Sequence, residues 1–315
     1  MPLQYDPEWH ALAGPTLEAS KEILPVNDVP TRRTRYEKPY EGIVPTVPDD
    51  IEMKVLGISA SDGHEIAIYC LSKKRDDSPA KLEPAVLHMH GGGFISVRAH
   101  HAVSSLVPFV SQSGVRIFTI DYRRAPEYPF PTPLEDCWSG LLYLQSNAEI
   151  LGIDTSRIAV WGESAGGALA ASLTLLARER GFSPPLAKQI LMYPMIDDRT
   201  VTDHTGGLDA ISINDVITAW TAYLGKAYGT DNLPSYASPG RVSDVKGLPP
   251  LYLDVGQLDL FLHEDIAYAQ KFLSSGIQAE LHVYPGVIHA FQRWSPNSQV
   301  VKQAFTNRLR AITSL

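Results

Sequence analysis

Between residues 160 and 167 the chain reads Val160-Trp161-Gly162-Glu163-Ser164-Ala165-Gly166-Gly167, and this stretch decides the fold. An apolar run typical of a strand leads into it, and a segment of small residues typical of a helix follows it. Glycine stands two positions before and two positions after the serine, as a tight strand-to-helix turn requires. Such a turn holds the hydroxyl clear of the sheet, so Ser164 is a candidate nucleophile. The alternative is a glycine turn with a capping serine.

Outward from this turn, short apolar runs alternate with longer segments of helical period from about residue 50 onward. This alternation is typical of βαβ units that build a mostly parallel sheet. The sequence therefore predicts an α/β fold in which helices flank an eight-stranded sheet. We expect strands at residues 53–58, 65–71, 85–90, 116–122, 157–161, 189–193, 251–255 and 280–284. We expect helices at residues 101–112, 133–147, 165–180, 263–274 and 298–312.

Three consecutive glycines follow the predicted strand at residues 85–90, in His90-Gly91-Gly92-Gly93-Phe94. Without side chains, their backbone N–H groups can point at an oxygen that becomes negative in a tetrahedral intermediate. A chance His-Gly-Gly-Gly is expected only roughly 0.004 times in a chain of this composition, so a merely flexible turn is a weak alternative. We expect the amides of Gly91, Gly92 and Ala165 to form an oxyanion hole.

An orienting carboxylate is expected on a loop at the carboxyl edge of the sheet. The predicted strand at residues 251–255 runs into a glycine turn, and Asp259 follows it in Gln257-Leu258-Asp259-Leu260. Asp254 lies within the strand, while Glu264 and Asp265 begin the next predicted helix as caps. Asp259 is therefore the candidate acid.

One of the ten histidines, His289, lies on a loop just beyond the last predicted strand. His282 is inside that strand, where a structural role is expected. The chain order of nucleophile, acid and base is then Ser164, Asp259 and His289. This order is that of the α/β-hydrolase fold and differs from the orders of the chymotrypsin and subtilisin triads.

These motifs, together with Asp121-Tyr122-Arg123-Arg124-Ala125-Pro126-Glu127-Tyr128-Pro129-Phe130-Pro131, closely resemble the hormone-sensitive-lipase family of esterases, also called bacterial family IV. The likeness runs from Pro84 to Phe291 and weakens over the first 50 residues. It implies carboxylesterase activity on short or medium acyl esters, a helical cap built from both irregular regions, and no metal or organic cofactor.

The chain departs from the family pattern at three places. Glu163 stands where one branch of the family has aspartate, and we interpret it as structural. Leu260 and Phe261 follow the acid where members usually have proline and leucine, so this loop is expected to differ in shape. Arg124 replaces the usual leucine, which concerns packing.

Two regions break the strand and helix alternation. Residues 1–50 are rich in proline and carry the basic cluster Arg32, Arg33 and Arg35, which we interpret as part of a solvated arm. Residues 196–246 form an insertion with one clear helix, whose apolar face would pack onto the rest of the molecule. We expect the arm and the insertion to form a cap over a core of residues 51–195 and 247–315. The residues on that helix face are Ile213, Val216, Ile217, Trp220 and Leu224.

Composition narrows the partners and the location. The chain has 315 residues, a formal charge of -8 and a pI near 5.7. This charge disfavours nucleic acid and anionic membranes, because both favour basic surfaces. Cys70 and Cys137 lie in apolar or amphipathic stretches typical of core packing, and no secretory signal or membrane-spanning segment is evident. We expect a soluble, cytoplasmic protein, with a homodimer through an edge strand as a reasonable assembly.

The sequence therefore predicts a serine carboxylesterase that acts through an acyl-enzyme. Hydrolysis of a lactone, thioester or aryl amide, or acyl transfer to another acceptor, uses the same triad and stays open. A non-catalytic receptor for a small molecule is the alternative from a different class. Phe94 and Trp220 are candidate pocket residues, with ordinary packing as the competing interpretation.

Overall fold

A single eight-stranded sheet organises the computed structural model, which describes residues 2–20, 22–74 and 81–315. Its strand order is β1-β2-β4-β3-β5-β6-β7-β8, with β2 antiparallel to both neighbours and the remaining pairs parallel. The predicted α/β class and the mostly parallel sheet are confirmed. The strands are β1 (Ile51–Ser59), β2 (Glu65–Lys73), β3 (Glu83–Met89), β4 (Arg116–Ile120), β5 (Ile153–Glu163), β6 (Lys188–Met192), β7 (Leu251–Gly256) and β8 (Ala279–Tyr284).

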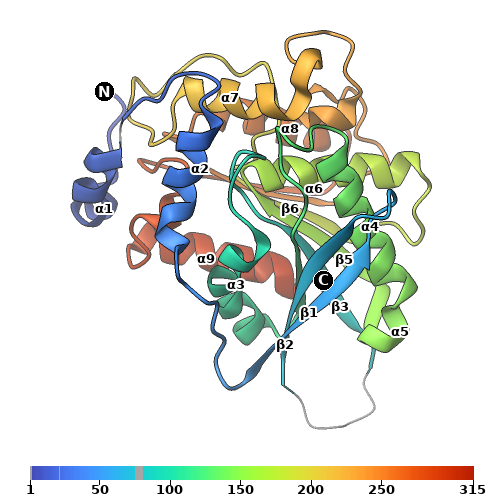
Figure 1. Cartoon of the computed structure of the whole chain (residues 1–315). Coiled ribbons are helices and arrows are strands. Elements are labelled where there is room, and N and C mark those ends of the chain that lie inside the picture. The colour runs from blue at the N-terminus through green and yellow to red at the C-terminus, as the bar shows by residue number, and fades with distance from the viewer. Residues whose placement is uncertain (1, 21, 75–80) are drawn as a thin grey trace.

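Helices cover both faces of this sheet (Figure 1). On one side α3 (Ala99–Ser113) packs against α9 (Gln299–Thr313), and on the other α4 (Thr132–Ser146) packs against α6 (Ala165–Glu179). Helix α8 (Leu262–Ser274) contacts β7 and β8, and the short α5 (Ala148–Leu151) precedes β5. Coverage of both faces explains why central strands read as nearly continuous apolar runs. Cys70 and Cys137 are buried free thiols within this packing.

The first 50 residues are more ordered than the sequence indicates. They form α1 (Pro7–Ser20), α2 (Val29–Glu37) and a short 3-10 turn (Lys38–Tyr40). Trp9 is fully buried and its indole N–H donates to the carbonyl oxygen of Phe291 at 2.9 Å. The interpretation of this region as a solvated arm is therefore wrong for α1, where Trp9, Ala13 and Leu17 are buried, whereas other apolar side chains such as Ile23 and Val44 are exposed.

The basic cluster in α2 is paired with carboxylates, and Arg32 in it is buried. Arg32 is fully buried, and its Nε donates to Asp215 of the insertion at 2.7 Å. Arg33 forms a two-point ion pair with Glu127, and Arg35 pairs with the exposed Glu22. For Arg32 and Arg33 the neutralising carboxylate lies far away in the sequence, so their charges appear free within a local window.

The insertion contains the expected helix, α7 (Ile213–Leu224). Ser212 and Asp215 cap its start reciprocally, as a capping box. Val216, Trp220 and Leu224 are buried along the predicted apolar face. Three short 3-10 turns complete the region (Gly225–Ala227, Ser235–Ala237 and Pro239–Arg241).

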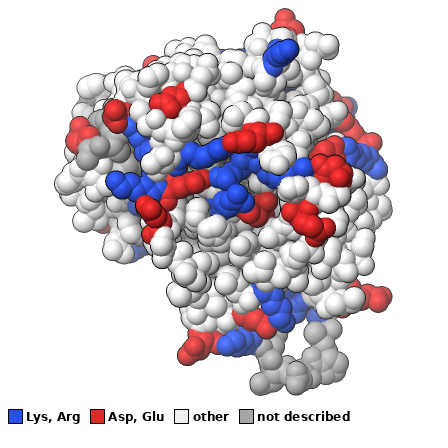
Figure 2. Space-filling model, viewed as in Figure 1, with Lys and Arg blue, Asp and Glu red and all other residues white. Residues whose placement is uncertain are grey.

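Among the helices that the structure describes, none combines the length and the apolar character needed to span a bilayer. On the face drawn in Figure 2, basic and acidic side chains are interspersed and do not form a patch of one sign.

Candidate active site

The hydroxyl, imidazole and carboxylate predicted from separate motifs meet in the structure. His289 Nε2 lies 2.9 Å from Ser164 Oγ, and His289 Nδ1 lies 2.8 Å from Asp259 Oδ2. Asp259 is fully buried and His289 nearly so. The other oxygen of Asp259 accepts a hydrogen bond from the Phe261 amide at 2.9 Å, which fixes the carboxylate plane. This chain of contacts can move a proton from the hydroxyl to the imidazole.

Ser164 sits on a strained turn between β5 and α6. Its φ is 55° and its ψ is -123°, a conformation that costs a non-glycine residue on the order of 1–3 kcal/mol. Both flanking glycines are needed for the turn. A Cβ at Gly162 would lie 2.1 Å from the carbonyl oxygen of Gly166, and one at Gly166 would lie 2.1 Å from that of Met89. The turn therefore holds the serine backbone in one geometry, with its amide bonded to the carbonyl of Met192 at 3.0 Å.

Aromatic rings and two carboxylates surround His289. Its ring makes edge contacts with Tyr193 and Phe261, at centroid distances of 4.8 and 5.1 Å. Burial alone would lower the pKa of His289. The charge and hydrogen bond of Asp259, together with the charge of Asp209, outweigh burial and hold this pKa above its usual value. The imidazolium that forms during proton transfer is thus stabilised where it is needed.

The segment that follows β4 holds the glycine loop after β3 through hydrogen bonds. The Tyr122 hydroxyl donates to the carbonyl oxygen of His90 at 2.7 Å, and the two rings stack. The Ala125 amide donates to the carbonyl of Phe94 at 2.9 Å. Gly92 has a φ of 119°, and a Cβ there would lie 2.3 Å from the carbonyl oxygen of Ser96. The loop is therefore a folded element with fixed amide directions.

Glu163, next to the serine, belongs to a buried polar chain. Its carboxylate contacts His88 Nε2 at 2.7 Å, and His88 Nδ1 contacts the Thr119 hydroxyl at 2.9 Å. Burial raises the pKa of Glu163, but the charge and hydrogen bond of His88, with the charge of His90, outweigh burial and hold this pKa below its usual value. The carboxylate of Glu163 is therefore held by His88 within this polar chain.

Comparison with known proteins identifies the family. A family model described as the alpha/beta hydrolase fold matches residues 86–293. The carboxylesterase NlhH of Mycobacterium tuberculosis is 31% identical over 291 residues, which cover 88% of each chain. The chain belongs to the alpha/beta-hydrolase family. Within this family, the predicted similarity to the hormone-sensitive-lipase type of esterase is confirmed.

Other members of the alpha/beta-hydrolase family are similar over most of the chain. The ethyl acetate hydrolase of Pseudomonas putida is 30% identical and covers 76% of this chain and 75% of its own. The solved structure of a bacterial heroin esterase superposes with a TM-score of 0.88 at 33% identity, over 99% of this chain and 98% of the other. A hyperthermophilic esterase from Pyrobaculum calidifontis gives 0.86 at 28% identity, over 100% and 99%.

Two of the three competing carboxylates near Asp259, those of Asp254 and Glu264, are engaged elsewhere in this alpha/beta hydrolase. Asp254 forms a buried two-point ion pair with Arg308, with both distances at 2.7 Å. Glu264 does not cap its own helix; it accepts from the amides of Ile196 and Asp197 at 2.6 and 3.0 Å. Asp265 is fully buried, and burial raises its pKa well above the usual range.

The two candidate pocket residues lie against each other. Phe94 and Trp220 are fully buried with ring centroids 5.2 Å apart, and Phe94 also stacks on Tyr223 at 4.0 Å. This aromatic group joins the glycine loop to α7, since a Cβ at Gly93 would lie 3.4 Å from that of Ala219. Substitution within α7 is therefore expected to affect the glycine loop.

Sequence reasoning missed Asp209, a carboxylate of the insertion. Its Oδ1 accepts from the backbone amide of His289 at 3.1 Å, and its Oδ2 accepts from that of Leu260 at 2.9 Å. No motif surrounds this residue, and an aspartate in a glycine-containing loop is usually solvated. Its partners could be found only from the fold.

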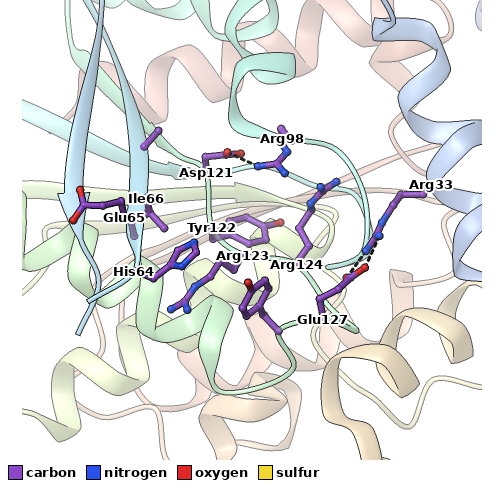
Figure 3. Close-up of a pocket in the computed structure, with 12 residues that line it drawn as sticks. Arg33, His64, Glu65, Ile66, Arg98, Asp121, Tyr122, Arg123, Arg124 and Glu127 are labelled. Carbon is purple, nitrogen blue, oxygen red and sulfur yellow. Dashed lines mark hydrogen bonds and ion pairs between the residues drawn. The ribbon is translucent and has the colours of Figure 1, made fainter. Parts of the chain in front are cut away.

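A separate cavity of about 450 Å³ lies around the segment after β4 (Figure 3). Its guanidinium groups face carboxylates: Arg33 pairs with Glu127 and Arg98 with Asp121. None of Ser164, Asp259 and His289 lines it. Within the part of the chain that the structure describes, no cluster of three or more histidine, cysteine, aspartate or glutamate side chains is placed to hold a metal ion.

Proposed function

We propose that this protein hydrolyses carboxylic esters through an acyl-enzyme on Ser164. The contact chain from Ser164 through His289 to Asp259, at 2.9 and 2.8 Å, is the observation that carries the proposal. Membership of the alpha/beta-hydrolase family and similarity to proteins named carboxylesterase and ethyl acetate hydrolase support it.

In the first step His289 Nε2 accepts the hydroxyl proton as Ser164 Oγ bonds to the ester carbonyl carbon. The carbonyl oxygen becomes negative and is held by backbone amides. His289 then gives its proton to the departing alcohol oxygen as the ester C–O bond breaks. Water repeats the sequence, which releases the acid and restores the serine. Asp259 holds the ring orientation and stabilises the imidazolium throughout.

The oxyanion donors are the amides of Gly92 and Ala165, with a third from the glycine run. The sequence favours Gly91 for this third place. The positive φ values of Gly92 and Gly93, 119° and 61°, are the local turns that direct these amides.

Short- and medium-chain acyl esters are the proposed substrates. Phe94 and Trp220 form the inner wall of the acyl pocket in this proposal, with Tyr223 behind them. Residues 1–50 and 196–246 act as the cap over the core of residues 51–195 and 247–315. Links between the arm and the insertion support this, among them the Arg32–Asp215 ion pair and a 2.9 Å hydrogen bond from the Asn27 amide to Thr218.

Hydrolysis of p-nitrophenyl butyrate tests the proposal. The wild-type protein should turn over this ester, and Ser164→Ala should lose on the order of a millionfold in kcat. Retention of most activity by Ser164→Ala would refute the mechanism, and an inactive wild type that still binds esters would favour the receptor alternative. A panel of lactones, thioesters and aryl amides separates the remaining alternatives.

Assembly and location remain predictions from the sequence. A homodimer would use an edge strand of the sheet, β1 or β8, and sedimentation equilibrium would detect it. Fractionation of the source cells would test the cytoplasmic location.

A further inference from the structure

Asp209 lies in the insertion, between β6 and α7, and its side chain points into the protein. The residue is 6% exposed. Its two carboxylate oxygens accept three backbone hydrogen bonds: Oδ1 from Ala210 at 2.7 Å and from His289 at 3.1 Å, and Oδ2 from Leu260 at 2.9 Å. A buried carboxylate with this many amide donors is held in one orientation.

Two of these three amides belong to the loops that carry the triad. Leu260 follows Asp259 on the loop after β7, and His289 lies on the loop after β8. One oxygen of Asp209 therefore holds the acid loop and the other holds the base loop. The distance of 2.8 Å between Asp259 Oδ2 and His289 Nδ1 depends on the relative position of these two loops.

The insertion presents this carboxylate from an organised turn. Asp203 accepts from the amides of Thr205 and Gly207 at 2.7 and 2.8 Å. Beyond it, the Tyr5 hydroxyl from the N-terminal region donates to the carbonyl oxygen of Leu208 at 2.6 Å. The backbone before Asp209 is thus anchored at two points, and the side chain reaches the triad loops from a fixed position.

We infer that Asp209 is a positioning residue, which clamps the acid and base loops together and thereby links the insertion to the triad. The inference rests on the proposed esterase function. It assigns Asp209 no contact with substrate; its effect passes through Asp259 and His289.

The charge of Asp209 also affects the pKa of His289, in addition to the hydrogen bonds that hold the two loops. Burial first, and then the charge of Asp259, raise the pKa of Asp209 to about 7. The charges of Asp259 and Asp209 raise the pKa of His289, and that of Arg293 lowers it. Asp209 is only partly ionised near pH 7, so removal of its charge should lower the pKa of His289 modestly and move the acid limb of kcat/KM slightly to lower pH. A residue that only packs would leave that limb in place.

The test compares Asp209→Asn and Asp209→Ala with Asp231→Asn, which removes the same charge from an exposed position in the same insertion. Asparagine keeps one acceptor oxygen, so one loop stays bound and the other loses its partner; alanine releases both. We expect Asp209→Ala to lower kcat for p-nitrophenyl butyrate by about tenfold to a hundredfold, with KM within about twofold, because small misalignment of catalytic groups has effects of this size. Asp209→Asn should fall between alanine and wild type and should shift the acid limb. Asp231→Asn should match wild type.

Wild-type kcat in Asp209→Ala would overturn the inference, as would a change confined to KM or an unmoved acid limb in Asp209→Asn. Thermal unfolding checks that each variant is folded. If the alanine variant is not, the asparagine variant, which is of equal size, decides through its kcat and its pH profile. An inactive Ser164→Ala with wild-type behaviour in both Asp209 variants would refute the clamp alone. An active Ser164→Ala would refute the proposed function itself.

Discussion

Replacing Arg32 by methionine tests how the N-terminal region is joined to the insertion. The Arg32 side chain is 1% exposed. Its Nε donates to Asp215 at 2.7 Å, and its terminal nitrogens donate to the carbonyls of Pro25, Asp28 and Leu24 at 2.6, 3.1 and 3.2 Å. Methionine has a similar length but no N–H donors. The carboxylate of Asp215 and the three carbonyl oxygens would therefore lose their hydrogen bonds to residue 32.

The size of the effect follows from the burial of the partner. Removing one member of a buried ion pair destabilises a protein by about 3–5 kcal/mol. The Asp215 side chain is 14% exposed and keeps its bonds to the amide and hydroxyl of Ser212. We therefore expect the free energy of unfolding to fall by about 3 kcal/mol, the low end of this range. At an unfolding entropy of about 2 cal/mol/K per residue, 1 kcal/mol corresponds to about 1.5 °C in a chain of 315 residues, so Tm should fall by about 4–5 °C.

Differential scanning calorimetry at pH 7 measures this change, with Arg35→Met as the matched control. Arg35 lies in the same helix, but it pairs with Glu22, whose side chain is 75% exposed. Such a pair contributes about 1 kcal/mol at most. Equal stability losses in the two variants would show that Arg32 does not join the arm to the insertion.

Further predictions concern the site. Asp259→Asn should lower kcat by about ten thousandfold while the protein stays folded, since the imidazole loses its orienting acceptor; a loss below tenfold would argue against this acid. Because the pKa of His289 lies above its usual 6.5, the acid limb of kcat/KM should have its midpoint above pH 6.5, and a rate independent of pH between 5 and 8 would contradict the assignment. Gly166→Ala should fail to form the turn, because its Cβ would lie 2.1 Å from the carbonyl oxygen of Met89; normal yield and activity would disprove this. Trp220→Ala should shift preference toward longer acyl chains in a p-nitrophenyl ester series, and an unchanged profile would remove Trp220 from the pocket.

The sequence was most informative where a function depends on local backbone geometry. Tight turns admit only glycine, so the flanks of Ser164 and the run after His90 are visible as residue patterns. The strands were recognisable from their apolar runs, and Asp259 and His289 from their places after the last two strands. Each of these signals lies within about ten residues of the group that it identifies.

Features that depend on distant partners left no such signal. Arg32 appeared solvated, because its partner Asp215 is 183 residues away. Asp209 appeared as an ordinary loop carboxylate, because the His289 amide that it binds is 80 residues away. In each case the side chain type is common, and only the fold brings its partner close.

The central claim is that His289 activates Ser164 beside the glycine loop, and the rate of phosphonylation at residue 164 measures this most directly. Intact-mass spectrometry with peptide mapping would follow a fluorophosphonate ester on wild type, Ser164→Ala and His289→Asn. The account predicts one phosphonyl group on Ser164 in the wild type, none on Ser164→Ala, and labelling slowed by at least about a hundredfold in His289→Asn. Labelling at another residue, or an undiminished rate in His289→Asn, would contradict it.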